Sequence, residues 1–244
     1  MPETPDPAGP VPAATMCVLR PGDGHYSVLM VHRGAAPFAP EMWVFPGGKL
    51  EEADQGAAAA TVVPGGAAPE VLASVRCAIR ETYEEAGVLV GADLDVASRL
   101  EMETDTSPGR FWDQLHGEGI VLDTEEVAYL SNWVTPAVSP LRFDTRFFVA
   151  LVAAGTQARH HPAEMLDAMW MTPENALTRY QEGEWPMILP TVKHLELLAS
   201  WEDATALVDY AKRSEVVAVH PHPVRDGDVW RFILPGEPGY EAAG

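Results

Sequence analysis

The pattern of apolar and polar positions in the first third of the chain predicts a β-hairpin followed by a further strand. Two segments of strand-like composition, AATMCVLR and YSVLMVHR, flank the turn sequence PGDGH. A short apolar run, MWVFP, then leads into Gly47 and Gly48. A helical period replaces this pattern at about residues 70–86, where one side of the predicted helix is apolar and Gly87 suits a left-handed C-cap.

The remainder of the chain predicts shorter strands and helices. Strands are expected near residues 132–135, 143–152 and 168–171. Helical segments are expected at residues 111–115, 123–128, 172–180, 191–200 and 202–212. A final hairpin is expected around Asp226-Gly227. This order of strands and helices predicts an α/β fold, with a mixed sheet and helices on both faces.

The run RETYEEAG, residues 80–87, places Glu81, Glu84 and Glu85 at positions i, i+3 and i+4. On a helix these offsets bring three carboxylates onto one narrow arc, where their like charges repel one another. A hard divalent cation such as Mg²⁺ or Mn²⁺ relieves this repulsion, because it prefers carboxylate and water oxygens. A solvated acidic helix face would show the same pattern, so the run alone leaves both interpretations open.

The surrounding sequence resembles the Nudix box, G-x5-E-x7-R-E-U-x-E-E-x-G-U, in which U is aliphatic. Residues 48–54 keep the first spacing with Asp54 in place of Glu, and residues 80–88 match the second half except at Thr82. The two halves are separated by 25 residues instead of seven. The inserted sequence, QGAAAATVVPGGAAP, is uncharged and rich in Ala, Gly and Pro, so we expect a surface loop that lengthens at little cost in stability.

An interrupted box is similar to that of one branch of the Nudix hydrolases, the coenzyme A diphosphatases of mammalian mitochondria and peroxisomes and their bacterial relatives. The resemblance extends over residues 14–212 and includes the segments RCAIRETYEEAGVLV, NWVTP and RFDTRFF. It implies the α/β/α sandwich of Nudix proteins, here with additional C-terminal helices and a terminal hairpin. It also implies hydrolysis of a nucleoside diphosphate that is linked to another group.

Divalent metals assist this reaction by neutralising the phosphates and activating water. The resemblance implies that the three glutamates hold Mg²⁺ or Mn²⁺. It also implies that Gly47 or Gly48 supplies a carbonyl ligand and a tight turn that lets a phosphate approach. Arg80 lies four residues before Glu84 and would hold that carboxylate in its rotamer, although an ordinary surface ion pair is the alternative.

The catalytic base is expected downstream of the box. The resemblance points to Glu164, six residues before Trp170, as the base or as an additional metal ligand. Asp167 is the substitute candidate, and Glu125 or Glu126 is a more distant one. A solvated loop carboxylate is the alternative interpretation of Glu164.

Three arginines are candidates for binding the phosphates of a substrate. Arg33 ends a predicted strand that is directed toward the box. Strand alternation places Arg142, Asp144 and Arg146 on one face, where the arginines could bind phosphates or form an ion pair through Asp144. Because the chain has a net charge of −20, a polyanionic substrate requires both a metal and a local basic cluster.

The same charge disfavours general binding to nucleic acids or anionic membranes. The chain contains no apolar run of about 18 residues, and its Pro-rich N-terminus lacks the basic start of a signal peptide. Cys17 and Cys77 lie in apolar patterns and are expected to be reduced core residues. We therefore expect a cytoplasmic protein with a small-molecule nucleotide substrate. A homodimer is compatible with the sequence, which does not decide the oligomeric state.

These inferences divide the chain into a disordered N-terminus (1–13), a Nudix hydrolase domain (14–200, with the insertion at about 55–69) and a helix-and-hairpin extension (201–244). We expect metal-dependent cleavage of CoA or acyl-CoA to phosphopantetheine and 3′,5′-ADP. Another coenzyme A branch of the family has a characteristic motif before its box, and VHRGAAPFAPEMWVFPGG retains only the end of that motif. ADP-ribose, NADH and nucleotide sugars are therefore kept as alternative substrates. A Nudix-fold binding module without catalysis is the alternative from another class.

Overall fold

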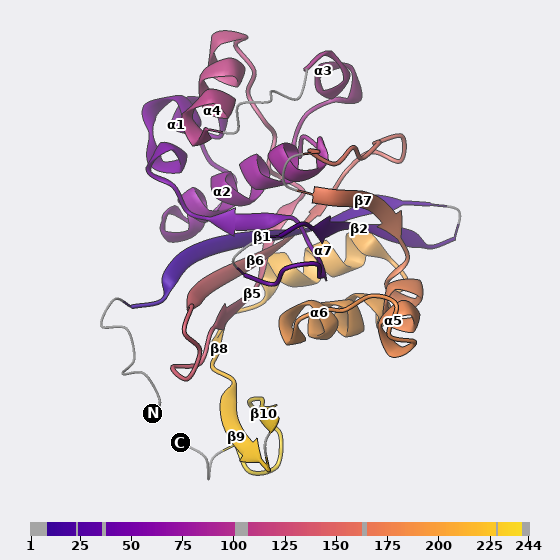
Figure 1. Cartoon of the computed structure of the whole chain (residues 1–244). Helices are drawn as coiled ribbons and strands as arrows, with labels where there is room; N and C mark the ends of the chain where they lie inside the picture. The colour runs from indigo at the N-terminus through magenta and orange to yellow at the C-terminus, as the bar shows by residue number, and fades with distance from the viewer. Residues whose placement is uncertain are drawn as a thin grey trace.

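A mixed β-sheet separates two layers of helices (Figure 1). The computed structural model describes residues 9–22, 24–35, 38–100, 107–162, 165–227 and 229–240. The strands of the large sheet are β1 (Val11–Pro21), β2 (Tyr26–Arg33), β3 (Trp43–Val44), β4 (Gly47–Lys49), β5 (Val127–Val134), β6 (Phe143–Leu151), β7 (Met165–Met171) and β8 (Ala218–Val219). The predicted α/β class with a mixed sheet is confirmed.

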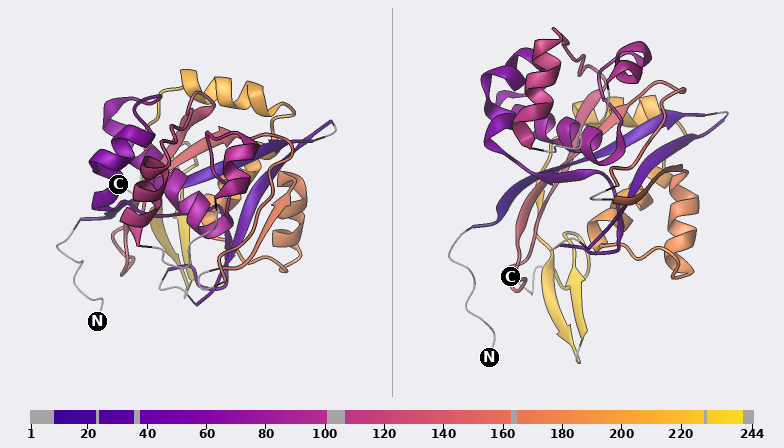
Figure 2. Two further views of the ribbon diagram at one scale, coloured as in Figure 1. Left: turned by 90° about the horizontal axis from the view of Figure 1, so that it is seen from above. Right: turned by 45° about the horizontal axis from the view of Figure 1, so that its top comes forward.

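The main path of the sheet runs β3-β2-β1-β6-β5-β8, while β4 pairs with β1 and β7 pairs with β2. The pairs β1–β6 and β5–β8 are parallel, and the other strand pairs are antiparallel. Strands β9 (His222–Asp226) and β10 (Val229–Ile233) form the predicted hairpin, which projects from the body of the molecule in the right-hand view of Figure 2.

One helical layer contains α1 (Ala57–Val62), α2 (Pro69–Ala86), α3 (Leu94–Arg99) and α4 (Pro108–Gly117), preceded by the 3₁₀ helix η1 (Glu52–Gln55). The other layer contains α5 (Pro173–Gln181), α6 (Leu189–Ala199) and α7 (Ala204–Arg213). None of the helices in the described ranges combines the length and the hydropathy that a membrane span needs.

Alternation along β1 builds the two apolar cores. Met16 and Val18 are fully buried in the core beneath α2, whereas Cys17 and Leu19 are fully buried in the core that includes α6 and α7. Burial of each such side chain contributes about 1.5–3 kcal/mol, so both layers are held firmly to the sheet.

Helix α2 begins at Pro69 and ends at Ala86, and the C-cap Gly87 adopts φ 65° and donates its N–H to the Tyr83 carbonyl at 2.8 Å. The left-handed C-cap predicted from the sequence is therefore present. Val75 and Ile79 lie on the buried apolar side of the helix. The fold thus presents the second half of the box on a rigid helix that packs against β1 and β4.

Only part of the insertion is the surface loop predicted from its composition. Residues 57–62 form α1, which packs against α4, and Ala59, Val62 and Val63 are fully buried, whereas residues 64–68 form an irregular connection to α2. The Val63 carbonyl accepts two hydrogen bonds from the Arg76 guanidinium, at 3.1 and 2.8 Å, and the Val62 carbonyl accepts one from the Leu122 N–H at 2.9 Å. Ala has the highest helix propensity, and neighbouring apolar residues supply a face to bury, so AAAATVV folds as a packed helix.

Other boundaries also differ from the predictions. Residues 123–126 form a turn before β5 instead of starting a helix; the Asp123 carboxylate accepts the Glu125 N–H at 2.9 Å, which competes with helical hydrogen bonding. Strand β1 begins at Val11, so the last residues of the predicted disordered N-terminus belong to the sheet. The main domain also continues past residue 200, because Leu207 and Val208 are fully buried and β8 pairs with β5.

His194 on α6 is a buried histidine, 3% exposed, whose ring stacks on Phe147. Its Nδ1 donates to the Pro190 carbonyl at 2.6 Å, since a carbonyl can only accept. Its Nε2 then accepts from the Ser131 hydroxyl at 2.6 Å. Burial lowers the pKa of His194 to about 4, so the folded protein holds this ring neutral.

We expect this histidine to make the protein less stable in mild acid. Between its ordinary pKa of 6.5 and the folded value of about 4, the unfolded chain binds the proton and the folded chain does not. The free energy of unfolding therefore falls as pH decreases through this window, by about 3 kcal/mol from this residue. Urea unfolding of the wild type and of His194→Gln should show a shallower decline in the variant. Parallel pH curves would contradict the prediction.

Candidate active site

The second half of the box lies against the first half at the contact between α2 and β4. The Glu85 carboxylate is buried and accepts the Gly47 N–H at 2.9 Å. Gly48 lies beneath the Glu81 carboxylate so closely that a Cβ at this position would overlap with it. Gly48 therefore allows Glu81 to approach the backbone of β4, whereas the missing Cβ of Gly47 allows the close approach of Ala14 and Thr15 of β1.

Arg80 organises the same glutamates from within α2. Its guanidinium is 2% exposed, and Nη1 donates to Glu81 Oε1 at 2.9 Å and to Glu84 Oε2 at 2.8 Å. The predicted Arg80–Glu84 contact is thus present in a buried setting, not as a surface pair. Burial by itself lowers the pKa of Arg80, but hydrogen bonds to Asp54 and the charges of Glu81 and Asp54 outweigh it and raise this pKa.

Asp54 anchors the other side of the Arg80 guanidinium. Arg80 donates through Nε to Oδ1 at 2.9 Å and through Nη2 to Oδ2 at 3.0 Å, a bidentate pair. The Trp112 indole N–H adds a bond to Oδ1 at 2.9 Å, and the Glu51 N–H adds one to Oδ2 at 3.0 Å. Asp54 is completely buried, and these four bonds satisfy its two oxygens. Sequence reasoning did not predict the contact between Trp112 and Asp54, because 58 residues separate them and no local spacing connects them.

Of the three arginines proposed for phosphates, the structure brings Arg33 to the glutamates. Its Nη1 lies 3.5 Å from Glu85 Oε1, and its Nε is buried without a partner among the described residues. Arg146 instead donates to the Ser74 hydroxyl at 2.8 Å, and Arg142 donates to the Thr135 carbonyl at 3.2 Å. In the described part of the chain, neither arginine forms the ion pair with Asp144 that was considered as the alternative.

The candidates for the base are scattered. Glu164 lies outside the described residues. Strand alternation on β7 places Asp167 with Met169 and Met171, on the sheet face opposite to α2, and its carboxylate accepts the Ala168 N–H. Asp167 is therefore not positioned as a substitute for Glu164.

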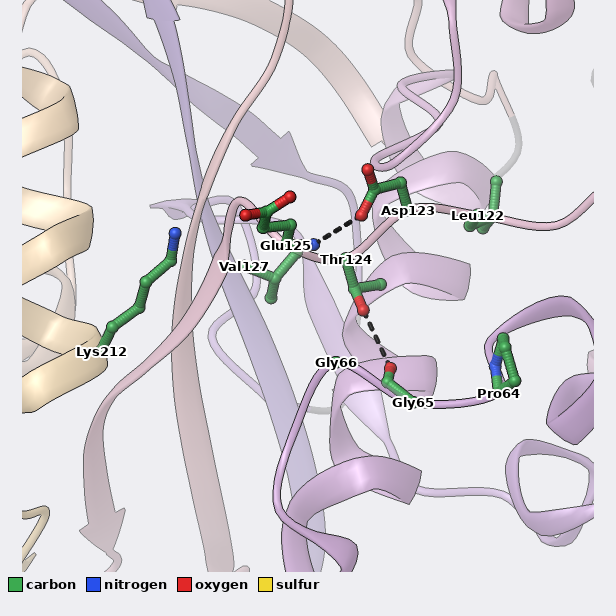
Figure 3. A pocket seen from close by; sticks show the side chains of 9 residues that line it. All are labelled: Pro64, Gly65, Gly66, Leu122, Asp123, Thr124, Glu125, Val127 and Lys212. Atoms are coloured by element: carbon green, nitrogen blue, oxygen red, sulfur yellow. Dashed lines mark hydrogen bonds between the residues drawn. The ribbon is translucent and has the colours of Figure 1, made fainter.

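Glu125 and Glu126 belong to a different part of the surface. Glu126 Oε2 lies 3.6 Å from Lys212 Nζ of α7. Glu125 and Lys212 line an open depression of about 510 Å³ together with Gly65 and Thr124 (Figure 3). None of the box glutamates lines this depression, so the structure does not bring Glu125 or Glu126 to them.

Two further buried residues, His161 and Cys77, lie beside the glutamates. The backbone N–H of His161 donates to the Glu85 backbone carbonyl at 3.1 Å. The His161 side chain is buried, and neither nitrogen of its imidazole has a hydrogen-bond partner among the described residues. The Cys77 thiol donates to the Lys49 carbonyl at 3.2 Å. Burial raises the pKa of Cys77, so this residue is a packed thiol, as the sequence predicted.

The donor set of the box fits a hard divalent cation, because it consists of carboxylate oxygens beside a backbone that glycine leaves open. The described residues contain no converged group of three or more His, Cys, Asp or Glu side chains that could hold a metal. The Glu81 and Glu84 carboxylates accept hydrogen bonds from Arg80. The Glu85 carboxylate accepts the Gly47 N–H and lies beside Arg33. Arg33 and Arg80 thus compensate only part of the charge of Glu81, Glu84, Glu85 and Asp54.

The fold and this constellation define a Nudix hydrolase domain. A NUDIX hydrolase structure from Alicyclobacillus acidocaldarius superposes with a TM-score of 0.73 and 29% sequence identity, over 84% of this chain and 97% of that one. The family model of the NUDT19 Nudix domain matches residues 59–198, more than half of the chain. The protein belongs to the NUDT19 Nudix domain family.

Two curated relatives agree with this assignment. Acyl-coenzyme A diphosphatase NUDT19 of Xenopus laevis is 25% identical over 214 residues, which cover 64% of this chain and 55% of that protein. Putative nudix hydrolase 7 of Caenorhabditis elegans is 26% identical over 208 residues, covering 81% and 63%. The chain therefore spans less than two thirds of the length of these relatives.

Proposed function

We propose that this protein is a divalent-metal-dependent pyrophosphohydrolase that cleaves CoA or acyl-CoA to phosphopantetheine and 3′,5′-ADP. The observation that carries the proposal is the position of Glu81, Glu84 and Glu85 around Arg80 and the glycine pair of β4. Hydrolysis of a P–O–P bond requires charge neutralisation on the phosphates and an activated water, and oxygen-rich sites of this kind supply both by binding metal.

In this proposal the three glutamates hold Mg²⁺ or Mn²⁺, and Gly47 or Gly48 adds a carbonyl oxygen. When bound, the metal supplies positive charge to the phosphates and lowers the pKa of the attacking water. Arg80 keeps Glu81 and Glu84 in place through its Nη1. The buried position of Arg80 limits its motion and so limits the rotamers open to both glutamates.

Glu164 remains the proposed base or additional metal ligand. As base it would take a proton from water while the water oxygen bonds to phosphorus and the bridging P–O bond breaks. Arg33, which lies beside Glu85, is proposed to bind a substrate phosphate. Arg142 and Arg146 remain proposed phosphate contacts, from positions beside Thr135 and Ser74.

The choice of CoA is supported by the branch of the family, because the family model is that of the NUDT19 Nudix domain and the Xenopus laevis relative is named an acyl-coenzyme A diphosphatase. We also propose a cytoplasmic protein, in keeping with two buried free cysteines, and a homodimer. Fractionation of the cells that produce it and light scattering coupled to size exclusion would check these two points.

The expected result of a substrate panel is the highest kcat/KM with CoA or acyl-CoA, with 3′,5′-ADP as a product. CoA, acyl-CoA, ADP-ribose, NADH, a nucleotide sugar and dNTPs are compared with Mg²⁺ and Mn²⁺, and products are separated by chromatography. A higher kcat/KM with ADP-ribose, NADH or the nucleotide sugar would replace the CoA proposal. Absence of metal-dependent turnover with every substrate would indicate a binding module instead.

A further inference from the structure

A continuous series of buried hydrogen bonds connects α4 to the box glutamates. The Trp112 indole N–H donates to Asp54 Oδ1 at 2.9 Å, and Asp54 accepts Nε and Nη2 of Arg80 at 2.9 and 3.0 Å. The remaining nitrogen of Arg80, Nη1, donates to Glu81 and Glu84 at 2.9 and 2.8 Å. One guanidinium therefore connects Asp54 with two of the three glutamates.

Asp54 determines that orientation, because a bidentate carboxylate lies in the plane of the guanidinium it binds. Asp54 and Trp112 are 0% and 1% exposed, so no bulk water can replace a lost bond. Oδ1 accepts from both Trp112 and Arg80, and Oδ2 accepts from Glu51 and Arg80. Without the indole N–H, Oδ1 would keep Arg80 Nε as its single donor, and the carboxylate would be held less tightly.

Trp112 is supplied from outside both halves of the box. It is held by edge-on contact with Phe111, at 4.7 Å between ring centroids, and α4 packs against α1 and η1. Since α1 is the helix of the insertion, the interruption of the box provides part of the packing that holds Trp112 over Asp54. Asp is one methylene shorter than the Glu usual at this position, and the indole N–H fixes this shorter side chain.

We propose that Trp112 is a positioning residue for the metal-binding glutamates, acting through Asp54 and Arg80. This inference rests on the proposed function, because it assumes that the glutamates bind a divalent cation. It assigns to α4 and the insertion a role in setting metal affinity. Residues that orient ligands in this way typically change metal affinity by about 10–100-fold when they are altered.

Two variants of the full chain test the role of the N–H. Trp112→Phe removes it together with part of the ring, and replacement of Trp112 by benzothienylalanine removes it while the volume is retained. We expect both variants to bind Mn²⁺ at least about 10-fold more weakly in calorimetry. The metal concentration for half-maximal hydrolysis should rise by the same factor. The benzothienylalanine protein keeps the test valid if Trp112→Phe does not fold.

Leu115→Val is the matched control, because Leu115 is another fully buried residue of α4 and has no side-chain polar atom that could bond to Asp54. It should lower stability and leave the Mn²⁺ dissociation constant unchanged. An unchanged dissociation constant in the benzothienylalanine protein, or an equal change in Leu115→Val, would overturn the positioning role. If the wild type binds no Mn²⁺ at all, the proposed function itself fails.

Discussion

Replacement of Glu85 by Gln is expected to lower kcat by more than about 100-fold, the upper range for residues that only orient a metal ligand. The change removes a negative charge from the buried carboxylate that lies beside Gly47 and Arg33. The Gln carbonyl can still accept the Gly47 N–H, so the fold is retained. Steady-state hydrolysis at saturating Mg²⁺ or Mn²⁺, together with a thermal unfolding curve, measures both effects.

Glu84→Gln is expected to act in the same direction, since its carboxylate shares Arg80 Nη1 with Glu81. Glu70→Gln is the matched control, because Glu70 lies exposed in the first turn of the same helix. It should keep wild-type turnover. Near wild-type rates in Glu84→Gln or Glu85→Gln at saturating metal would show that these carboxylates do not hold the catalytic ion.

Arg80→Ala is expected to lower the free energy of unfolding by about 3–5 kcal/mol, the range for removal of one partner from a buried ion pair. The substitution leaves Asp54 completely buried with two of its four donors gone, and it removes the cation between Glu81 and Glu84. Urea unfolding in EDTA provides the measurement. Added Mn²⁺ should restore part of the loss, because a bound cation again compensates the glutamates.

Arg80→Lys separates charge from geometry. Lysine keeps the positive charge but cannot form the bidentate pair with Asp54, so an intermediate loss of stability is expected. In the double variant Arg80→Ala with Asp54→Ala, the loss should be smaller than the sum of the single losses, because both partners of one network are removed. Additive losses, or a change below about 1 kcal/mol in Arg80→Ala, would show that the network does not stabilise the fold.

Much of the site could be predicted from the sequence because it depends on local spacing. The offsets of Glu81, Glu84 and Glu85 place them on one side of any α-helix, and the i, i+4 spacing brings Arg80 to Glu84. Gly87 ends that helix because glycine adopts positive φ without strain. Alternation along β1 likewise predicts which residues enter each core.

Predictions that relied on composition were less successful. The insertion was expected to be a loop because it has no charge and many small residues, yet residues 57–62 form a helix that packs against α4. Composition does not say whether a partner surface exists to bury such a segment. Asp167 had the right chemistry for a base, but its position on β7 directs it to the sheet face opposite to α2.

The sequence by itself determined the α/β class, the helix that carries the glutamates and the approach of Arg80 to Glu84, because these follow from backbone periods and neighbours within one turn. Only the tertiary structure decided that Trp112 and Asp54 meet, that Arg33 reaches Glu85 and that Arg142 and Arg146 have other partners. These contacts join residues from separate elements, and such residues meet only when sheet pairing and core packing place their elements side by side.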